Sequence, residues 1–416
     1  MFRRTIIVVA PECVSGQRLL EAARKLGYRV VVAVVVPPEQ DANIRWHLVC
    51  TPERPGTCDR LIWLSSYTEL VAALADEGEI AAVIPGSEFG VEVAELLADH
   101  FGVRGNPPAT SAMRRNKGKM KEALAAAGLN PARGGCFNSS SAAVEFALRE
   151  LSWPVMAKPP DGAAALNVFR CRNADELRQA VARVMETPDG YGKVPHGVVV
   201  EEFIPGEEYA VNLFGDEEKL VVSSVWRYEW SSTPFADRIY WNDFQEDPDD
   251  PRLAELVEYA KRVYRAVGIK LGPAHAEIKL SPRGPVAMEI GARMMGCANE
   301  TFVDCGMRVD VPRSTVEVFV SGKSSMPDHP RLHERLGCAT LPYVVGGTVR
   351  AVKGLDEIRR LPTYLCEEMP IKAGDVIRPS RYLDECASAV WLKADSEAEL
   401  KRDLALVHEK FQVETV

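Results

Sequence analysis

The segment 273–296, PAHAEIKLSPRGPVAMEIGARMMG, restricts the possible folds of this chain more than any other stretch of its sequence. Apolar and polar residues alternate on both sides of Arg283, which is typical of two short strands joined by a tight turn. Glu277 and Glu289 are equally distant from Arg283, so a hairpin that turns there places the two carboxylates opposite each other on adjacent strands.

Side chains alternate between the faces of a strand, so His275 and Lys279 lie on the same face as Glu277. Two opposed carboxylates repel each other, and we therefore expect a positive group between them. Mg²⁺ binds carboxylate oxygens together with the phosphate oxygens of a nucleotide, which makes a divalent ion one interpretation. The other interpretation is a solvated hairpin in which Lys279 or Arg293 neutralises the glutamates.

Length and charge limit the classes of function. The 416 residues predict two or three domains, and a hydrophobic content of 46% is sufficient for their cores. Lys and Arg number 50 against 59 Asp and Glu, and the net charge of −9 argues against a broad nucleic-acid-binding surface. A local cluster of positive groups must therefore hold any anionic ligand.

No segment has the pattern of a signal peptide or a membrane span. The apolar run in MFRRTIIVVAPE is too short for a signal-peptide core, and residues 29–38 do not reach the roughly 20 residues that a span needs. The ten cysteines are scattered without a C-x-x-C pair, which argues against a zinc site and a disulfide framework. We therefore predict a cytoplasmic protein.

Residues 1–108 have the alternating pattern of a doubly wound parallel α/β domain, with apolar strands at 4–10, 29–36 and 80–88. The turn after the first strand holds one glycine and no G-x-G-x-x-G, so a dinucleotide site has little support. Glu88 follows a strand at the edge where such sheets bind ligands. It either borders a site or caps the next helix.

The rest of the chain mixes short strands and helices, which is typical of α+β lobes, and residues 331–416 are predicted to form a compact terminal α+β lobe. Residues 231–241, SSTPFADRIYW, are expected to form a loop. The predicted helices lie at 114–127, 141–150, 174–186, 252–267, 309–321 and in the segment SEAELKRDLALVHEKF.

Two lysines have positions that suit phosphate binding. Lys117 opens a predicted helix and Lys158 ends a predicted apolar strand. Each ammonium can act as a point charge for phosphate oxygens, although a lysine that begins a helix is more often solvated. The loop 161–167, DGAAALN, can cover a ligand with its backbone N–H groups, but its single glycine makes this signal weak.

Other residues are candidates for contacts with a nucleotide or a substrate. In VVVEEFIPGEEYAVNLF, backbone groups can meet the edge of a base, although the segment taken alone is only a charged hairpin. Arg293 suits a developing phosphate charge or neutralises the glutamates. Arg227 can pair with a substrate carboxylate, although its aromatic strand is as readily a packing surface. His275 orients a substrate or phosphate oxygen, or is a satisfied structural histidine.

Four motifs occur in order: NKGKM, WPVMAKP, EEFIPGEEYAV, and HAEIK with GPVAMEIGARMMG. Together they resemble the ATP-grasp superfamily over roughly residues 1–410, and their wording looks most like the L-amino-acid ligase branch. Members of that branch join a carboxylate to an amine and cleave ATP to ADP and phosphate. The resemblance implies an ATP-grasp fold with a small lobe at about 109–200 and a large lobe at about 201–330, against which the terminal lobe packs.

The resemblance also implies roles for individual residues. Lys117 and Lys158 would contact the nucleotide phosphates, and Arg293 would stabilise an acyl phosphate. Glu277 and Glu289 would bind two Mg²⁺ or Mn²⁺ ions. Adenine and ribose would be contacted by Glu201 at the amino group, by Glu202, Phe203 and Ile204 along the base edge, and by Glu208 at the ribose. The substrates are expected near Glu88, Arg227, His275, Gly296 and Cys297.

Two departures from the superfamily pattern affect these expectations. The usual Asn two residues after the second metal glutamate is Gly291 here, so one metal ligand must come from phosphate, water or elsewhere. The amino-acid ligase branch often lacks this Asn too. The phosphate loop lacks the usual serine and several glycines, and Asn167 is expected to replace a glycine at positive φ.

The expected activity is an ATP-dependent carboxylate–amine ligase that joins amino-acid-type substrates through an acyl phosphate. The alternatives are a purine-pathway or bicarbonate-using, carboxylase-like ATP-grasp enzyme, and an ATP-binding protein without turnover. The expected partners are small-molecule carboxylates and amines, with no nucleic acid and no membrane. Small α/β ligases often form homodimers, although the sequence shows no interface.

Overall fold

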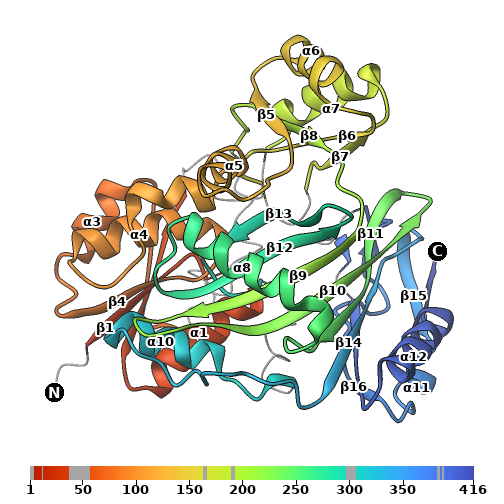
Figure 1. Cartoon of the computed structure of the whole chain (residues 1–416). Helices are drawn as coiled ribbons and strands as arrows, with labels where there is room; N and C mark the ends of the chain where they lie inside the picture. Colours follow the sequence, from red (N-terminus) through yellow and green to blue (C-terminus); the bar gives the residue numbers. More distant parts are fainter. Residues whose placement is uncertain are drawn as a thin grey trace.

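The computed structural model describes residues 4–11, 13–36, 57–162, 166–188, 193–296, 306–381, 385–386 and 388–416. Figure 1 shows them as an N-terminal α/β region, a small lobe that carries α6 and α7, and a large central sheet that continues into the C-terminal strands. The predicted combination of a parallel α/β layer with α+β layers is confirmed.

Four parallel strands form the N-terminal sheet in the order β3-β2-β1-β4. Leu19 of α1 packs on one face of this sheet, and Leu70 of α3 and Leu97 of α4 pack on the other. The doubly wound prediction is therefore confirmed, and β3 and α3 are additional to the predicted elements. The bounds are β1 Thr5–Val9, α1 Cys13–Lys25, β2 Arg29–Val35, β3 Arg60–Leu64, α3 Tyr67–Leu74, β4 Ile80–Pro85, η2 Glu88–Gly90 and α4 Val91–His100.

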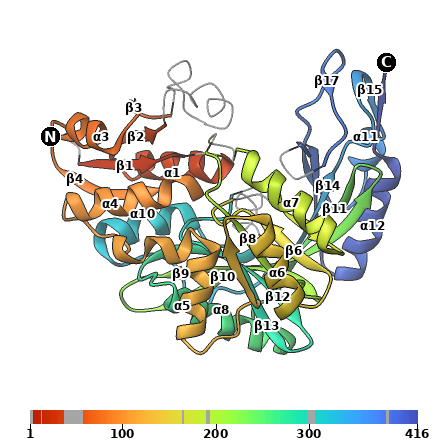
Figure 2. The same ribbon diagram turned by 90° about the horizontal axis from the view of Figure 1, so that it is seen from above.

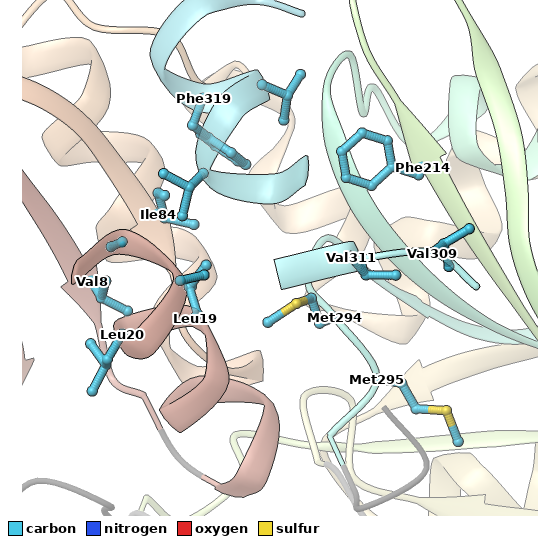
Figure 3. Close-up of a cluster of buried hydrophobic side chains, with 14 of the residues drawn as sticks. Val8, Leu19, Leu20, Ile84, Phe214, Met294, Met295, Val309, Val311 and Phe319 are labelled. Carbon is cyan, nitrogen blue, oxygen red and sulfur yellow. The ribbon is translucent and has the colours of Figure 1, made fainter. Parts of the chain in front are cut away.

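Helix α10 (Val311–Ser321) comes from a distant part of the sequence and packs beside α1 on the N-terminal region. Figure 3 shows Leu19 and Ile84 of the N-terminal region on one side of Phe319 in α10, and Met294 nearby. All four belong to one buried cluster. This shared core fixes the N-terminal region relative to the segment that follows β13.

The small lobe is an antiparallel sheet in the order β5-β8-β6-β7, with α6 and α7 packed against it. Strand β6 ends at Lys158 as predicted. Helix α5 begins at Lys117, but its buried residues Met120 and Leu124 join the core of the large sheet. The bounds are η3 Pro108–Arg114, α5 Lys117–Ala126, β5 Gly134–Phe137, α6 Ser140–Glu150, β6 Val155–Lys158, β7 Phe169–Cys171, α7 Ala174–Glu186 and β8 Val198–Glu202.

Eight strands form the large sheet in the order β13-β12-β9-β10-β11-β14-β18-β16. The predicted loop at 231–241 is wrong, because β10 continues to Thr233 and pairs with β11 from Ala236. The polar Ser-Ser-Thr run suggests a loop, but cross-strand pairing of the long aromatic ladder outweighs that local preference. The bounds are β9 Glu207–Gly215, β10 Leu220–Thr233, β11 Ala236–Glu246, η4 Pro251–Leu253, α8 Ala254–Ala266, β12 Gly272–Ser281, β13 Gly284–Gly291, β14 Arg335–Leu341, β16 Tyr364–Glu368 and β18 Ser388–Ala394.

The predicted boundary near residue 330 falls between strands of one sheet, because β14, β16 and β18 extend the large sheet. Helix α12 begins after the capping residue Ser396 and covers these strands. None of the helices in the described ranges is long and apolar enough to cross a membrane. The remaining elements are β15 Gly347–Lys353, α11 Leu355–Ile358, β17 Val376–Ile377, α12 Glu397–Lys410 and β19 Gln412–Thr415.

Candidate active site

A cleft lies between the small lobe and the large sheet. Figure 2, which views the molecule from above, shows β6 and β8 of the small lobe over the part of the large sheet that includes β10 and β12. The lining residues are Lys117, Met156, Lys158, Pro159, Gly162, Leu166, Val168, Glu201, Glu202, Phe203, Ile204, Glu208, Trp230, Arg238, Tyr240, His275, Glu277, Lys279, Met288, Glu289 and Arg293.

The hairpin of β12 and β13 pairs Glu277 with Glu289 as predicted, but the register differs from the prediction nearer the turn, where Ser281 pairs with Gly284 and a β-bulge follows between Ile278 and Glu277. His275, Glu277 and Lys279 all face the cleft. The intervening Ile278 points to the opposite face and packs in the core with α8. The period-two prediction is therefore confirmed for β12. On β13 it fails beside the bulge, where the consecutive residues Met288 and Glu289 both line the cleft.

The positive group beside the paired carboxylates is Lys117. Its Nζ lies 3.0 Å from Glu289 Oε2 and donates a hydrogen bond of 2.7 Å to the Gly162 carbonyl. Lys279 donates instead to the Ile204 carbonyl at 3.1 Å. Burial alone would raise the pKa of Glu277, but His275, Arg293 and Lys117 lower it below its usual range. The carboxylates of the hairpin are therefore balanced by Lys117, which is distant in sequence, together with His275 and Arg293.

The two glutamates have the chemistry of a Mg²⁺ or Mn²⁺ site. Among the described residues, no group of three His, Cys, Asp or Glu side chains is arranged to hold a metal ion. Mg²⁺ usually takes only one or two carboxylates from a protein and completes its shell with phosphate and water oxygens. Glu277 and Glu289 therefore fit a metal ion that arrives together with a polyphosphate.

Glu201 is buried between two ammonium groups. Lys158 Nζ lies 2.6 Å from Glu201 Oε1, and Lys121 pairs with Oε2 and donates to the Ala132 carbonyl at 3.1 Å. Burial would raise the pKa of Glu201, yet the two lysines lower it to about 2. Lys121 is absent from the predicted site, although its spacing of four residues from Lys117 places both on one face of a helix.

The apolar end of the cleft is lined by Met156, Ile204 and Met288. Phe203 lies beside them, with the Arg170 guanidinium 4.4 Å from its ring centroid. The Glu202 N–H donates to the Arg133 carbonyl at 2.8 Å, and its carboxylate pairs with Arg283 at 2.6 Å. The side chain of Glu202 is therefore occupied by arginines.

Glu208 forms an ion pair with Arg238 of β11. The Arg238 guanidinium lies 3.6 Å from the ring centroid of Trp230, and Trp230 and Tyr240 have ring centroids 4.0 Å apart. The β10–β11 hairpin thus brings a second arginine into the cleft. Because the sequence predicts a loop for this segment, it does not predict that Arg238 lines the cleft.

Glu88 connects the N-terminal region to the cleft. It accepts hydrogen bonds from Arg115 and from Arg293, whose Nε lies 2.8 Å from Glu88 Oε2. Burial opposes ionisation, but the two guanidiniums lower the pKa of Glu88 to about 2. A Cβ at residue 291 would overlap with Glu88 Oε2, so glycine leaves room for this carboxylate in the position where the two arginines hold it.

Arg227 is not among the residues that line the cleft. It lies on the other face of β10 from Trp226 and pairs with Glu246 at 2.7 Å and with Glu397 at 2.8 Å. Gly296 also lies outside the lining, and Cys297 and residues 163–165 are outside the described residues.

Asn167 has φ 57°, so the predicted positive φ is confirmed. In the phosphate loop, Asn167 therefore adopts a left-handed backbone conformation, which usually favours glycine.

Comparison with known proteins agrees with this geometry. Residues 151–301 match the family model described as ATP-grasp domain. Dapdiamide A synthase of Enterobacter agglomerans is 26% identical over 307 residues, which cover 72% of this chain and 70% of that protein. The L-arginine-specific L-amino acid ligase of Bacillus subtilis is 24% identical over 353 residues, which cover 84% of this chain and 83% of that protein.

The fold agrees with a solved structure as well. The crystal structure of L-amino acid ligase from Bacillus licheniformis superposes with a TM-score of 0.81 at 19% identity and covers 100% of both chains. The domain match, the two relatives and the shared fold lead to one conclusion: this chain contains an ATP-grasp domain at residues 151–301 and shares its overall fold with a solved L-amino acid ligase.

Proposed function

We propose that the chain is an ATP-dependent carboxylate–amine ligase that forms an amide bond between amino-acid-type substrates and releases ADP and phosphate. The observation that carries the proposal is a hairpin of paired carboxylates facing a single cleft with cationic side chains from several elements. These cations are Lys117, Lys158, Arg238, Lys279 and Arg293. The relatives named for L-amino acids and for dapdiamide A support the substrate class.

The cleft divides into parts that suit the parts of ATP. Met156 and Met288 offer apolar surfaces to adenine, and Glu208 offers a carboxylate to the ribose. Lys117 and Lys158 offer ammonium groups to the phosphates. When bound, divalent ions at Glu277 and Glu289, which we expect to be two in number, supply positive charge to the triphosphate.

The first chemical step joins the substrate carboxylate to phosphate. A carboxylate oxygen attacks the γ-phosphorus, and the bond from that phosphorus to the bridging oxygen of ADP breaks. Negative charge stays on the transferred group and on ADP, where Lys158 and Arg293 can stabilise it without forming a covalent bond. Positioning and electrostatics are therefore sufficient, and no protein nucleophile is required.

The second step forms the amide. The amine nitrogen attacks the acyl carbon, phosphate leaves with the electron pair of the carbon–oxygen bond, and the nitrogen loses a proton. Because water would hydrolyse the acyl phosphate, the small lobe must cover the cleft during this step. The hydrogen bonds from Lys117 Nζ to the Gly162 carbonyl and from the Lys117 N–H to the Pro160 carbonyl already join the phosphate loop to α5.

The test is phosphate release with ATP, Mg²⁺ and a matrix of amino-acid pairs, with the products identified by mass. We expect dipeptide-like products for some pairs, loss of ADP release in Glu289→Gln, and unchanged turnover in Glu145→Gln, whose carboxylate is exposed on α6. Unchanged turnover in Glu289→Gln would contradict the metal assignment.

The same assay distinguishes the alternatives. ATP cleavage that needs bicarbonate and yields no amide would favour a carboxylase-like enzyme. Bound ATP without ADP release for every pair would favour a binding protein. We also propose a reducing, cytoplasmic compartment, which the free thiols of Cys136 and Cys171 support. A homodimer remains a prediction that light scattering can test.

A further inference from the structure

The orientation of His275 is fixed by a chain of buried groups. Asn212 lies beside it on β9 and is 5% exposed, and His275 is 6% exposed. The Asn212 amide NH₂ donates to Ser224 Oγ at 2.8 Å and faces Met295 Sδ at 3.4 Å. Because a thioether sulfur can only accept a hydrogen bond, this edge of the amide must be the NH₂.

The carbonyl edge of Asn212 therefore faces His275, with Oδ1 2.8 Å from His275 Nδ1. An amide oxygen only accepts, so Nδ1 carries a proton. In the neutral ring this leaves the lone pair on Nε2, and a hydrogen bond that fixes the other ring nitrogen is the arrangement found behind most metal-binding histidines.

Nε2 of His275 faces a second acceptor. It lies 3.6 Å from Glu277 Oε1, and both residues line the cleft. Neighbouring ligands of an octahedral ion with bonds of about 2.1 Å are about 3.0 Å apart, so a small movement of either side chain would let one ion bind both atoms. In the free protein these two side chains attract each other, and an ion that binds both atoms would replace that attraction.

His275 is paired across the strands with Gly291, which has no side chain, and the space beside Gly291 is filled by Glu88. At this point β13 offers no ligand side chain, whereas the paired residue of β12, His275, does. Glu88 is already held by Arg115 and Arg293.

We infer that His275 is a protein ligand of the metal site, which it binds through Nε2 beside Glu277. The inference rests on the proposed function, because it assumes that a metal–nucleotide complex enters the cleft. His275 would then hold an ion that the glutamates and the phosphate oxygens share, and Asn212 would be the residue that orients it.

The experiment is pulsed EPR of Mn²⁺ bound with ADP to the full chain. A directly bound imidazole couples its nitrogen to the Mn²⁺ electron spins. We expect this coupling in the wild-type complex, and we expect it to change when the protein is labelled with ¹⁵N-histidine. The isotope comparison uses the unaltered protein and is therefore independent of any effect of a substitution on folding.

Variants assign the coupling to one histidine. We expect its loss in His275→Gln and its retention in His100→Gln, whose ring is exposed on α4. Asn212→Ala should weaken Mn²⁺ binding by about 10–100-fold, as for other residues that orient a metal-binding histidine. Retention of the coupling in His275→Gln would overturn the assignment.

The outcomes separate the inference from the proposed function. A bound Mn²⁺–ADP complex without nitrogen coupling would overturn the role of His275 and leave the ligase proposal intact. It would mean that Nε2 serves as a hydrogen-bond donor in the complex. Failure of Mn²⁺ and ADP to bind at all would overturn both.

Discussion

Replacing Glu201 by glutamine tests the electrostatic account of the cleft most directly. Glu201 is 2% exposed and lies between Lys158 and Lys121, which are 6% and 8% exposed. The substitution keeps the shape of the side chain and removes its charge. Two buried ammonium groups then lose the carboxylate that they share, and breaking such a buried pair typically costs about 3–5 kcal/mol.

The pKa of Glu201 gives an independent magnitude. The two lysines lower this pKa from 4.5 to about 2 against the opposing effect of burial. At about 1.36 kcal/mol per pH unit, this corresponds to about 3 kcal/mol of stability. Because the pKa is lower in the folded state, the stabilisation is complete above pH 4.5 and is lost as the pH falls from 4.5 towards 2.

The assay is denaturant unfolding of the wild type and Glu201→Gln at pH 7, 5 and 3.5, with hydrogen exchange of the β8 amides as a local measurement. We expect Glu201→Gln to be less stable by about 3 kcal/mol at pH 7 and the difference to shrink at pH 3.5. Glu202→Gln is the matched control, because Glu202 pairs with exposed arginines and should cost about 1 kcal/mol or less. Equal stability of Glu201→Gln and wild type at pH 7, or a difference that does not depend on pH, would refute the reasoning.

Three further predictions follow from the same contacts. Gly291→Ala should displace Glu88 from Arg293 and lower the rate of ADP release by about 100-fold, as steady-state kinetics can measure, because small misplacements in an active site are costly. Arg227→Met should reduce the free energy of unfolding by about 3–5 kcal/mol, since it removes one partner of a buried ion-pair network. The KM values of the surviving Arg227→Met enzyme should be unchanged, and a selective rise for one amino acid would instead support a substrate contact. Removal of divalent ions with EDTA should weaken ATP binding at least tenfold in calorimetry, and Glu289→Gln should show a smaller dependence on the metal.

The sequence contains enough information to predict the hairpin. The period of two places Glu277 on the cleft face of β12, which is a local property. Its pairing with Glu289 does not follow from symmetry about Arg283, because Ser281 pairs with Gly284 at the turn and a β-bulge between Glu277 and Ile278 shifts the register. The apolar run before Lys158 likewise predicts that a strand ends at this residue, as β6 does. Where a side chain depends on its own strand or helix, the sequence pattern is therefore sufficient.

Residues that depend on distant partners are harder to predict. Lys121 gains its role from Glu201, which is 80 residues away, and the role of Arg238 depends on the pairing of β10 with β11. Arg227 shows the opposite case. Its aromatic neighbours suggest a pocket, but the alternation of β10 turns it towards Glu246 and α12.

Before any nucleotide binds, cationic side chains of the cleft form ion pairs with carboxylates. Four pairs share this arrangement: Lys117 with Glu289, Lys158 with Glu201, Arg238 with Glu208, and Arg293 with Glu88. Without these carboxylates the cations would repel one another in a poorly solvated space.

A triphosphate that draws Lys117 away leaves Glu289 opposite Glu277 without the lysine that pairs with it. A divalent ion then supplies the positive charge that the two glutamates have lost. Glu201 needs no such ion, because it remains paired with Lys121 when Lys158 binds the phosphates. The glutamates of the hairpin therefore need a metal ion only once the nucleotide is bound, which is why the metal and the triphosphate should bind as one complex.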